Sequence, residues 1–273
     1  MPLQSDGDVR IGGRQRGEGL SATRQIRDFG RELAVAFQFL TRIPMPSTKF
    51  EEDSLSRSVK FFPLVGLAIG SIAALLQRIL TVHLGRPLTA FVVLTYLVLI
   101  TGCLHEDGLA DAADGFGGGW TKDRILAILR DSRIGSYGAI ALVLSLLARY
   151  LLLASLPMER FTAYIISAHV LSRWSSLPLS YFLAPAREQE GQGARIARLI
   201  SFHSLLFGSL VSIAIVIFAL RRFSVAPLLA APLLVVLSGW FYQRKIGGIT
   251  GDCFGATNQL TEIAVYFCGV WIA

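Results

Sequence analysis

Charged residues and cysteines are both scarce in this chain of 273 residues. Only 16% of the residues are Asp, Glu, Lys or Arg, whereas an ordinary soluble domain is roughly a quarter charged. The three cysteines, Cys103, Cys253 and Cys268, form no CxxC pair, which argues against a disulfide framework or a zinc site. No cleavable signal peptide is evident, because the first apolar stretch begins only near residue 33.

Apolar residues instead dominate the chain, at 53% of the total, with a mean hydropathy of +0.55. A helix needs about 20 apolar residues to cross a bilayer. We therefore predict an all-α, polytopic membrane bundle with about seven spans. The predicted spans are 61–82, 87–104, 137–156, 161–183, 203–220, 225–242 and 263 to the end. The net charge of +7 lies mostly between these runs, where it is typical of topology signals and not of nucleic-acid binding.

The N-terminal region differs from the rest. Residues 1–25 are rich in Gly, Arg, Gln and Ser, which predicts a disordered tail. Residues 28–43 then predict an amphipathic helix at the membrane interface, ending at Pro44. Residues 26–273 are predicted to form a single membrane-embedded domain.

Basic residues predict the orientation of this domain. With the N-terminus inside, the loops at 45–60, 105–135, 184–202 and 243–257 are cytoplasmic and hold most of the Lys and Arg. The pair Arg221 and Arg222 on the other side is the exception. Gly66 and Gly70 form a small-xxx-small pattern typical of close helix contacts, which also leaves a homo-oligomer open.

An acidic stretch between two apolar runs, from His105 to Gly138, carries the strongest chemical signal. It contains Glu106, Asp107, Asp111, Asp114, Asp123 and Asp131. If 105–116 is a helix, Asp107, Asp111 and Asp114 share one face. Such carboxylates repel unless a cation neutralises them, and oxygen ligands suit Mg²⁺ or Mn²⁺. The alternative is a solvated acidic helix end, with the following glycines as a plain loop.

Two further polar segments predict phosphate binding. In RDSRIG, Arg130 and Arg133 could hold phosphate oxygens, and Asp131 could be a metal ligand or a base; surface charges at a helix end are the alternative. The second segment, RKIGGITGDCFGATNQLTE, combines basic residues with a glycine-rich turn, as in a phosphate cradle or an ordinary turn. Its candidate binding residues are Lys245, Asp252, Asn258 and Glu262.

Three ionisable residues lie inside predicted spans: Arg149, His169 and Arg173. Ionisable residues within a membrane are functional candidates by default. The alternatives are arginines that extend to the interface and a histidine that only packs.

The motifs together resemble one family. HEDGLADAADGFGGG, LRDSRIGSYG and GGITGDCFGATNQLTE, with FLTRIPMP and FFPLVGLAIG before them, are similar to the cobalamin synthases, the adenosylcobinamide-GDP ribazoletransferases. The resemblance runs from about residue 33 to the end. It implies a Mg²⁺-dependent bacterial inner-membrane enzyme with its site facing the cytoplasm. Such an enzyme joins adenosylcobinamide-GDP to α-ribazole or α-ribazole 5′-phosphate and releases GMP.

A shorter similarity links Asp111, Asp114 and Gly115 to the D-x-x-D-G signature of CDP-alcohol phosphatidyltransferases. Gly118 and Gly119 depart from that signature, so a shared mechanism is analogy only.

The resulting prediction is a phosphotransferase. Asp107, Asp111 and Asp114 are predicted to bind Mg²⁺, and Asp114 or Asp131 to accept the proton. The predicted substrate-binding residues are Arg130, Arg133, Lys245, Asp252, Asn258 and Glu262. The alternatives are a transporter with an acidic cation site and a scaffold without enzymatic activity. The acidic residues cluster outside the apolar runs, which argues against the transporter. The lipid bilayer and the two substrates are the predicted partners, and nucleic acid is not.

Overall fold

The computed structural model describes residues 13–45, 54–186 and 200–272, with side chains from Arg27 onward. Within these residues the structure is helical, and its one β-pairing is a parallel bridge between Pro185 and Ile249. The all-α prediction is confirmed. The helices are α1 (Gly13–Leu40), α2 (Ser54–Ser58), η1 (Val59–Phe61), α3 (Phe62–Thr101), α4 (Leu104–Gly118), α5 (Lys122–Ile128), α6 (Ser136–Ser155), α7 (Met158–Trp174), α8 (Ser176–Phe182), α10 (Phe202–Leu220), η2 (Arg221–Ser224), α11 (Val225–Ile246) and α12 (Gly251–Trp271).

Three continuous helical segments of the described chain are long and apolar enough to cross a membrane: 54–101, 136–155 and 202–246. The first of them changes direction at Gly85, whose φ of 69° is readily available only to glycine. The third contains η2 between α10 and α11. The breaks predicted at 83–86 and 221–224 therefore both occur.

Two other helices, α7 and α12, form the interior of the bundle. The helix α7 has 17 residues, and α12 is rich in polar side chains, among them Asn258, Gln259 and Glu262. Both are largely buried against their neighbours. In contrast, α6, α10 and α11 expose large apolar side chains such as Phe218 and Leu229, as helices in contact with lipid do.

The glycine pair in α3 packs against α7. A Cβ on Gly70 would lie 2.9 Å from the Cα of Ile166, and a Cβ on Gly66 would meet the backbone of His169. The small-xxx-small pattern thus serves a contact inside the chain. It gives no reason to infer a homo-oligomer.

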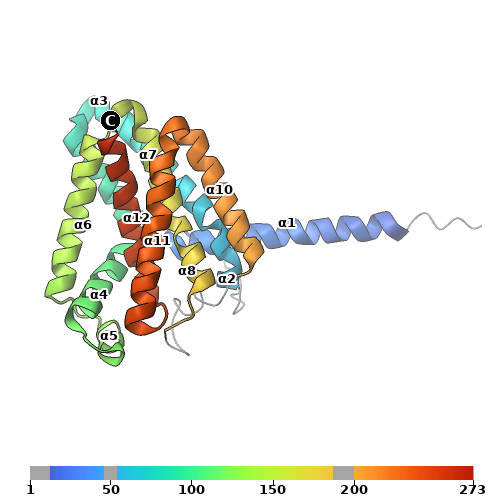
Figure 1. The fold of residues 1–273 in the computed structure, drawn as a ribbon. Helices are drawn as coiled ribbons and strands as arrows, with labels where there is room; N and C mark the ends of the chain where they lie inside the picture. The colour runs from blue at the N-terminus through green and yellow to red at the C-terminus, as the bar shows by residue number, and fades with distance from the viewer. Residues whose placement is uncertain (1–12, 46–53, 187–199, 273) are drawn as a thin grey trace, which may run out of the picture.

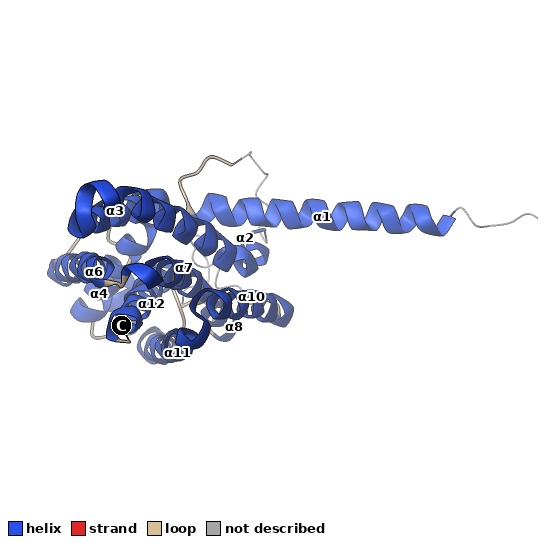
Figure 2. Ribbon diagram, turned by 90° about the horizontal axis from the view of Figure 1, so that it is seen from above, coloured by secondary structure: helices blue, strands red, loops and turns tan. Residues whose placement is uncertain are grey.

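Several helix boundaries differ from the predicted ones. The helix α1 begins at Gly13, within the predicted tail, and runs crosswise to the bundle (Figures 1 and 2). The predicted span 161–183 is divided into α7 and α8, because the ring of Pro178 cannot continue the helical hydrogen bonds. The last helix starts at Gly251 and so includes the second polar motif from that glycine onward. Residues 1–12 lie outside the described residues. So do residues 46–53 of the predicted loop 45–60 and residues 187–199 of the predicted loop 184–202.

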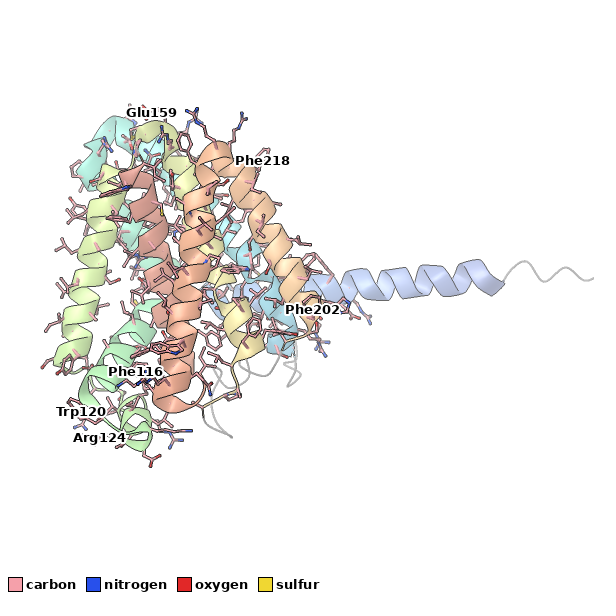
Figure 3. The ribbon with its side chains drawn as sticks, viewed as in Figure 1. Phe116, Trp120, Arg124, Glu159, Phe202 and Phe218 are labelled. Carbon is pink, nitrogen blue, oxygen red and sulfur yellow. The ribbon has the colours of Figure 1, made fainter. Side chains whose placement is uncertain are left out.

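The turns of the bundle fall at two ends. The Nη2 of Arg86 donates to the carbonyl of Leu156, and Arg160 lies 4.0 Å from the centre of the Phe223 ring. The turns at Gly85, between α6 and α7, and at η2 therefore lie together. The end of α4 and the helix α5 lie at the opposite end, where Figure 3 labels Phe116, Trp120 and Arg124. The acidic and glycine-rich motifs thus share one end, as predicted.

Candidate active site

A close helix crossing brings the two motifs together. The chain enters α4 through Gly102 and Cys103, which have φ angles of 61° and 62°. In α4, Gly108 then faces Gly255 of α12: a Cβ on Gly255 would lie 3.1 Å from the Cα of Gly108. Since neither position carries a side chain, the two backbones approach closely. Asp107 and Asp111 of α4 consequently lie near Asp252 of α12.

The electrostatics of Asp111 reflect this convergence. Its pKa is raised from 3.8 to about 6, first by burial and then by the negative charges of Asp107, Asp252 and Asp114. Within the described residues, no three His, Cys, Asp or Glu side chains are close enough to one another to hold a metal ion. The carboxylates therefore repel one another without converging on a single point.

Asp114 was predicted to share a helix face with Asp107 and Asp111, but its carboxylate contacts a different part of the chain. Its Oδ2 accepts a hydrogen bond of 2.6 Å from the backbone N–H of Gly135, and its Oδ1 accepts one of 2.9 Å from Gly138. Both oxygens of this buried carboxylate are thus engaged at the beginning of α6. Asp114 fixes α6 to α4, and its predicted metal-binding and catalytic roles stay predictions.

Asp131 forms an exposed ion pair with Arg133. The guanidinium donates from Nε at 2.9 Å and from Nη2 at 2.6 Å. These hydrogen bonds lower the pKa of Asp131 from 3.8 to about 2. A carboxylate of such low pKa is a weak general base, so the predicted catalytic role, which also stays a prediction, gains no support from this geometry.

Basic side chains surround this end of the bundle. Arg130, Arg133 and Lys245, all predicted to bind phosphate, are exposed. Lys122, which the sequence did not single out, joins them: a Cβ on Gly247 would lie 3.4 Å from its Nζ. The beginning of α5 is therefore adjacent to the glycine-rich turn of the second motif.

The ionisable residues inside the spans form one buried cluster. Arg149 donates to Glu106 at 2.6 Å and to Glu262 at 2.9 Å, and an Nη1–Oε2 distance of 3.6 Å separates Arg173 from Glu262. Arg149 and Arg173 are 1% and 2% exposed, which excludes the alternative that they extend to the interface. His169 completes the cluster through Arg173 and Tyr266.

This buried cluster holds together the helices that carry the candidate site. It joins α4, α6, α7 and α12 through paired charges, and removing one partner of such a pair leaves a costly buried charge. Glu106 directly precedes Asp107, so the cluster fixes the register of α4. Glu262 is 1% exposed and pairs with arginines here; its predicted role in substrate binding stays a prediction.

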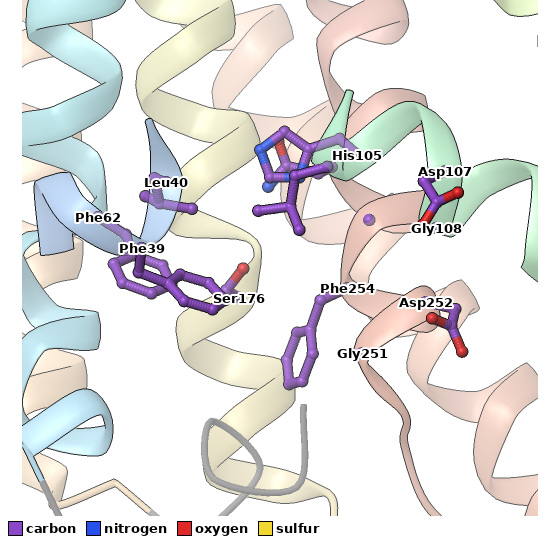
Figure 4. A pocket seen from close by; sticks show the side chains of 13 residues that line it. Phe39, Leu40, Phe62, His105, Asp107, Gly108, Ser176, Gly251, Asp252 and Phe254 are labelled. Atoms are coloured by element: carbon purple, nitrogen blue, oxygen red, sulfur yellow. The ribbon is translucent and has the colours of Figure 1, made fainter. Parts of the chain in front are cut away.

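A pocket of about 200 Å³ opens beside the crossing of α4 and α12. Its lining includes Asp107 and Asp252, and deeper within it His105 and Asn258. Figure 4 shows the two carboxylates on one side of this space and phenyl rings on the other. Two acidic residues, one from each motif, thus border a single cavity.

Residues 32–270 match the family described as cobalamin-5-phosphate synthase. The chain belongs to this family. Three similar proteins carry the name adenosylcobinamide-GDP ribazoletransferase. The protein of a Sinorhizobium species is 42% identical over 88% of this chain and 96% of its own length. That of Ralstonia nicotianae is 38% identical over 88% and 95%, and that of Vibrio cholerae 35% identical over 85% and 90%. No solved structure matches the chain.

Besides Lys122, three residues of this cobalamin-5-phosphate synthase family member were missed by the sequence analysis. Gly108 and Gly255 set the crossing, and Glu106 anchors α4. A signal was available for the glycines, since each lies within three residues of a candidate aspartate. The pairing of Glu106 with Arg149 had none, because the two residues are 43 positions apart.

Proposed function

We propose that this chain is an adenosylcobinamide-GDP ribazoletransferase, which catalyses the final joining step of cobalamin synthesis. It transfers the cobinamide phosphate of adenosylcobinamide-GDP to a ribose hydroxyl of α-ribazole or α-ribazole 5′-phosphate and releases GMP. The observation that carries this proposal is the convergence of Asp107 and Asp111 with Asp252 beside a pocket. The relatives that bear this name span nearly the whole chain.

Mg²⁺ is the ion we propose for the carboxylates. The raised pKa of Asp111 indicates repulsion that a cation would relieve. Mg²⁺ typically takes only one or two carboxylates and completes its shell with water and phosphate oxygens, so a three-carboxylate cage is not required. One or two of Asp107, Asp111 and Asp252 would hold it, and when bound it would polarise the β-phosphorus and neutralise the departing phosphate.

The reaction itself is a single displacement. The ribose oxygen forms a bond to the β-phosphorus, the bond from this phosphorus to the oxygen of GMP breaks, and the hydroxyl proton passes to a carboxylate. We place that proton on the member of the Asp107, Asp111 and Asp252 group that does not bind the ion, because Asp131 is paired with Arg133 and has a pKa of about 2. The basic residues at this end would bind the pyrophosphate through charge-assisted hydrogen bonds: Lys122, Arg130, Arg133 and Lys245.

We further propose that the site faces the cytoplasm of a bacterial inner membrane. Soluble nucleotide reactants are cytoplasmic, and the bundle end that carries α4 and α5 is rich in basic side chains, as cytoplasmic loops are. The apolar outer faces of α6, α10 and α11 would contact the bilayer.

The test is GMP release from adenosylcobinamide-GDP and α-ribazole by the detergent-purified protein, with Mg²⁺ or with EDTA. Release is expected only with Mg²⁺. The variant Asp111→Asn is expected to lose turnover while keeping its fold, because the isosteric amide cannot bind the cation as a carboxylate does. Asp123→Asn, a change of the same kind at an exposed residue of α5, is expected to retain it. Turnover by Asp111→Asn at the wild-type rate would refute the metal assignment.

A further inference from the structure

The pocket beside the α4–α12 crossing has two unlike sides. One side is aromatic: Phe39 and Phe62 stack with ring centres 5.8 Å apart and planes 9° apart, and Phe254 lines the cavity with them. The other side is acidic, formed by Asp107 and Asp252. Figure 4 shows the ring of His105 over the space between these two sides. A ligand that fits both sides has an apolar flat part and a polar part.

Two residues that line the pocket also carry buried polar atoms without a partner. The Nε2 of His105 and the Oδ1 of Asn258 have no hydrogen-bond partner among the described residues. Both side chains are at least 95% buried, since they are 5% and 2% exposed. An unsatisfied buried polar group costs about 1–3 kcal/mol. A ligand atom that accepts a hydrogen bond from the ring of His105 would recover part of that cost.

The size of the pocket limits the ligand to one part of a substrate. Its volume of about 200 Å³ is below the ~300–1,000 Å³ of sites that enclose a whole small molecule. A flat bicyclic ring fits such a space, and phenyl walls favour ring stacking. The lining offers few polar side chains beyond those already named: Ser176 is the remaining one.

We propose that this pocket holds the benzimidazole base of the ribazole acceptor and directs its ribose toward Asp107 and Asp252. This inference rests on the proposed function. A guanine base carries several donors and acceptors along its edge, and the aromatic side of the pocket offers them no partner. A benzimidazole has one free ring nitrogen and an apolar remainder. With the base inside, the ribose hydroxyl reaches the carboxylates at the rim.

The test compares two phenylalanines of similar burial. Phe254 lines the pocket and is 6% exposed, whereas Phe161 is 3% exposed and lies near the other end of the bundle. The KM for α-ribazole is expected to rise about two- to tenfold in Phe254→Leu, because a ring contact of about 0.5–1.5 kcal/mol is lost. The KM for adenosylcobinamide-GDP is expected to stay within about twofold. Phe161→Leu is expected to leave both KM values unchanged.

Other outcomes overturn the inference. If Phe254→Leu raises only the KM for adenosylcobinamide-GDP, the guanine binds in the pocket. If the variant is folded and both KM values are unchanged, neither base binds there. Phe39→Leu provides the same comparison from α1 if Phe254→Leu fails to fold. If the wild-type protein releases no GMP, the proposed function fails by itself. Equilibrium dialysis with α-ribazole then decides the pocket: weaker binding by Phe254→Leu alone supports the inference, and equal or absent binding refutes it.

Discussion

At the scale of single residues, four aspartates of one short stretch have four different environments. Asp107 is exposed, Asp111 is surrounded by other carboxylates, Asp114 accepts two backbone hydrogen bonds, and Asp131 is paired with an arginine. Their spacing was enough to predict the helix and the shared face of the first three. It could not distinguish them, because Asp114 is held by residues 21 and 24 positions away, and such contacts depend on how α4 and α6 pack.

The raised pKa of Asp111 predicts a dependence of stability on pH. In the folded protein this carboxyl binds its proton up to about pH 6, against 3.8 when unperturbed, so without metal the free energy of unfolding falls as pH rises through that window. In EDTA at pH 7.5, Asp111→Asn is expected to be about 1 kcal/mol more stable than the wild type, after allowance for screening of this partly exposed group. Near pH 4 the two proteins are expected to unfold alike.

Thermal unfolding in detergent measures this difference. Addition of Mg²⁺ at pH 7.5 is expected to raise the Tm of the wild type, since an ion that binds only the folded state stabilises it. It is expected to leave the Tm of Asp111→Asn nearly unchanged. An equal rise in both proteins would show that the ion binds elsewhere.

At the scale of elements, the site depends on one crossing. Hydrophobic runs predicted the outer helices well, because lipid requires long apolar surfaces. They predicted α12 less well: its beginning at Gly251 lies twelve residues before the apolar run at 263. The polar residues of this helix face other helices inside the bundle, so hydropathy gave no sign of them. Hydropathy likewise gave no sign of the contact of Gly108 with Gly255, although both glycines lie within three residues of a candidate aspartate.

The variant Gly255→Ala tests this crossing. Its Cβ would lie 3.1 Å from the Cα of Gly108, a backbone atom, so α4 and α12 must separate. The kcat for GMP release is expected to fall about ten- to hundredfold, as small displacements of reacting groups do, and stability to fall by about 1–3 kcal/mol. Gly30→Ala, where an added Cβ meets nothing within 4 Å, is the control. A lower Tm with unchanged kcat would mean that the crossing only supports the fold.

At the scale of the whole molecule, the bundle separates its two ends. The turns at Gly85, between α6 and α7, and at η2 lie at one end, and the candidate site lies toward the other. Basic residues occur at both ends, since Arg86, Arg160 and the pair Arg221 and Arg222 belong to the first. The orientation of the protein in the membrane was therefore predicted from an excess of basic residues at one end, because basic residues are not confined to that end.

Cysteine labelling decides the orientation. In a background with the three native cysteines replaced by serine, Trp120→Cys reports on the end with the site and Arg222→Cys on the opposite end; both positions are exposed. A membrane-impermeant maleimide is expected to label Trp120→Cys in inverted inner-membrane vesicles and Arg222→Cys in right-side-out spheroplasts, with GMP release confirming that each variant is folded. The opposite pattern would place the carboxylates on the side of the membrane that lacks soluble nucleotides, which is incompatible with a donor that carries GDP.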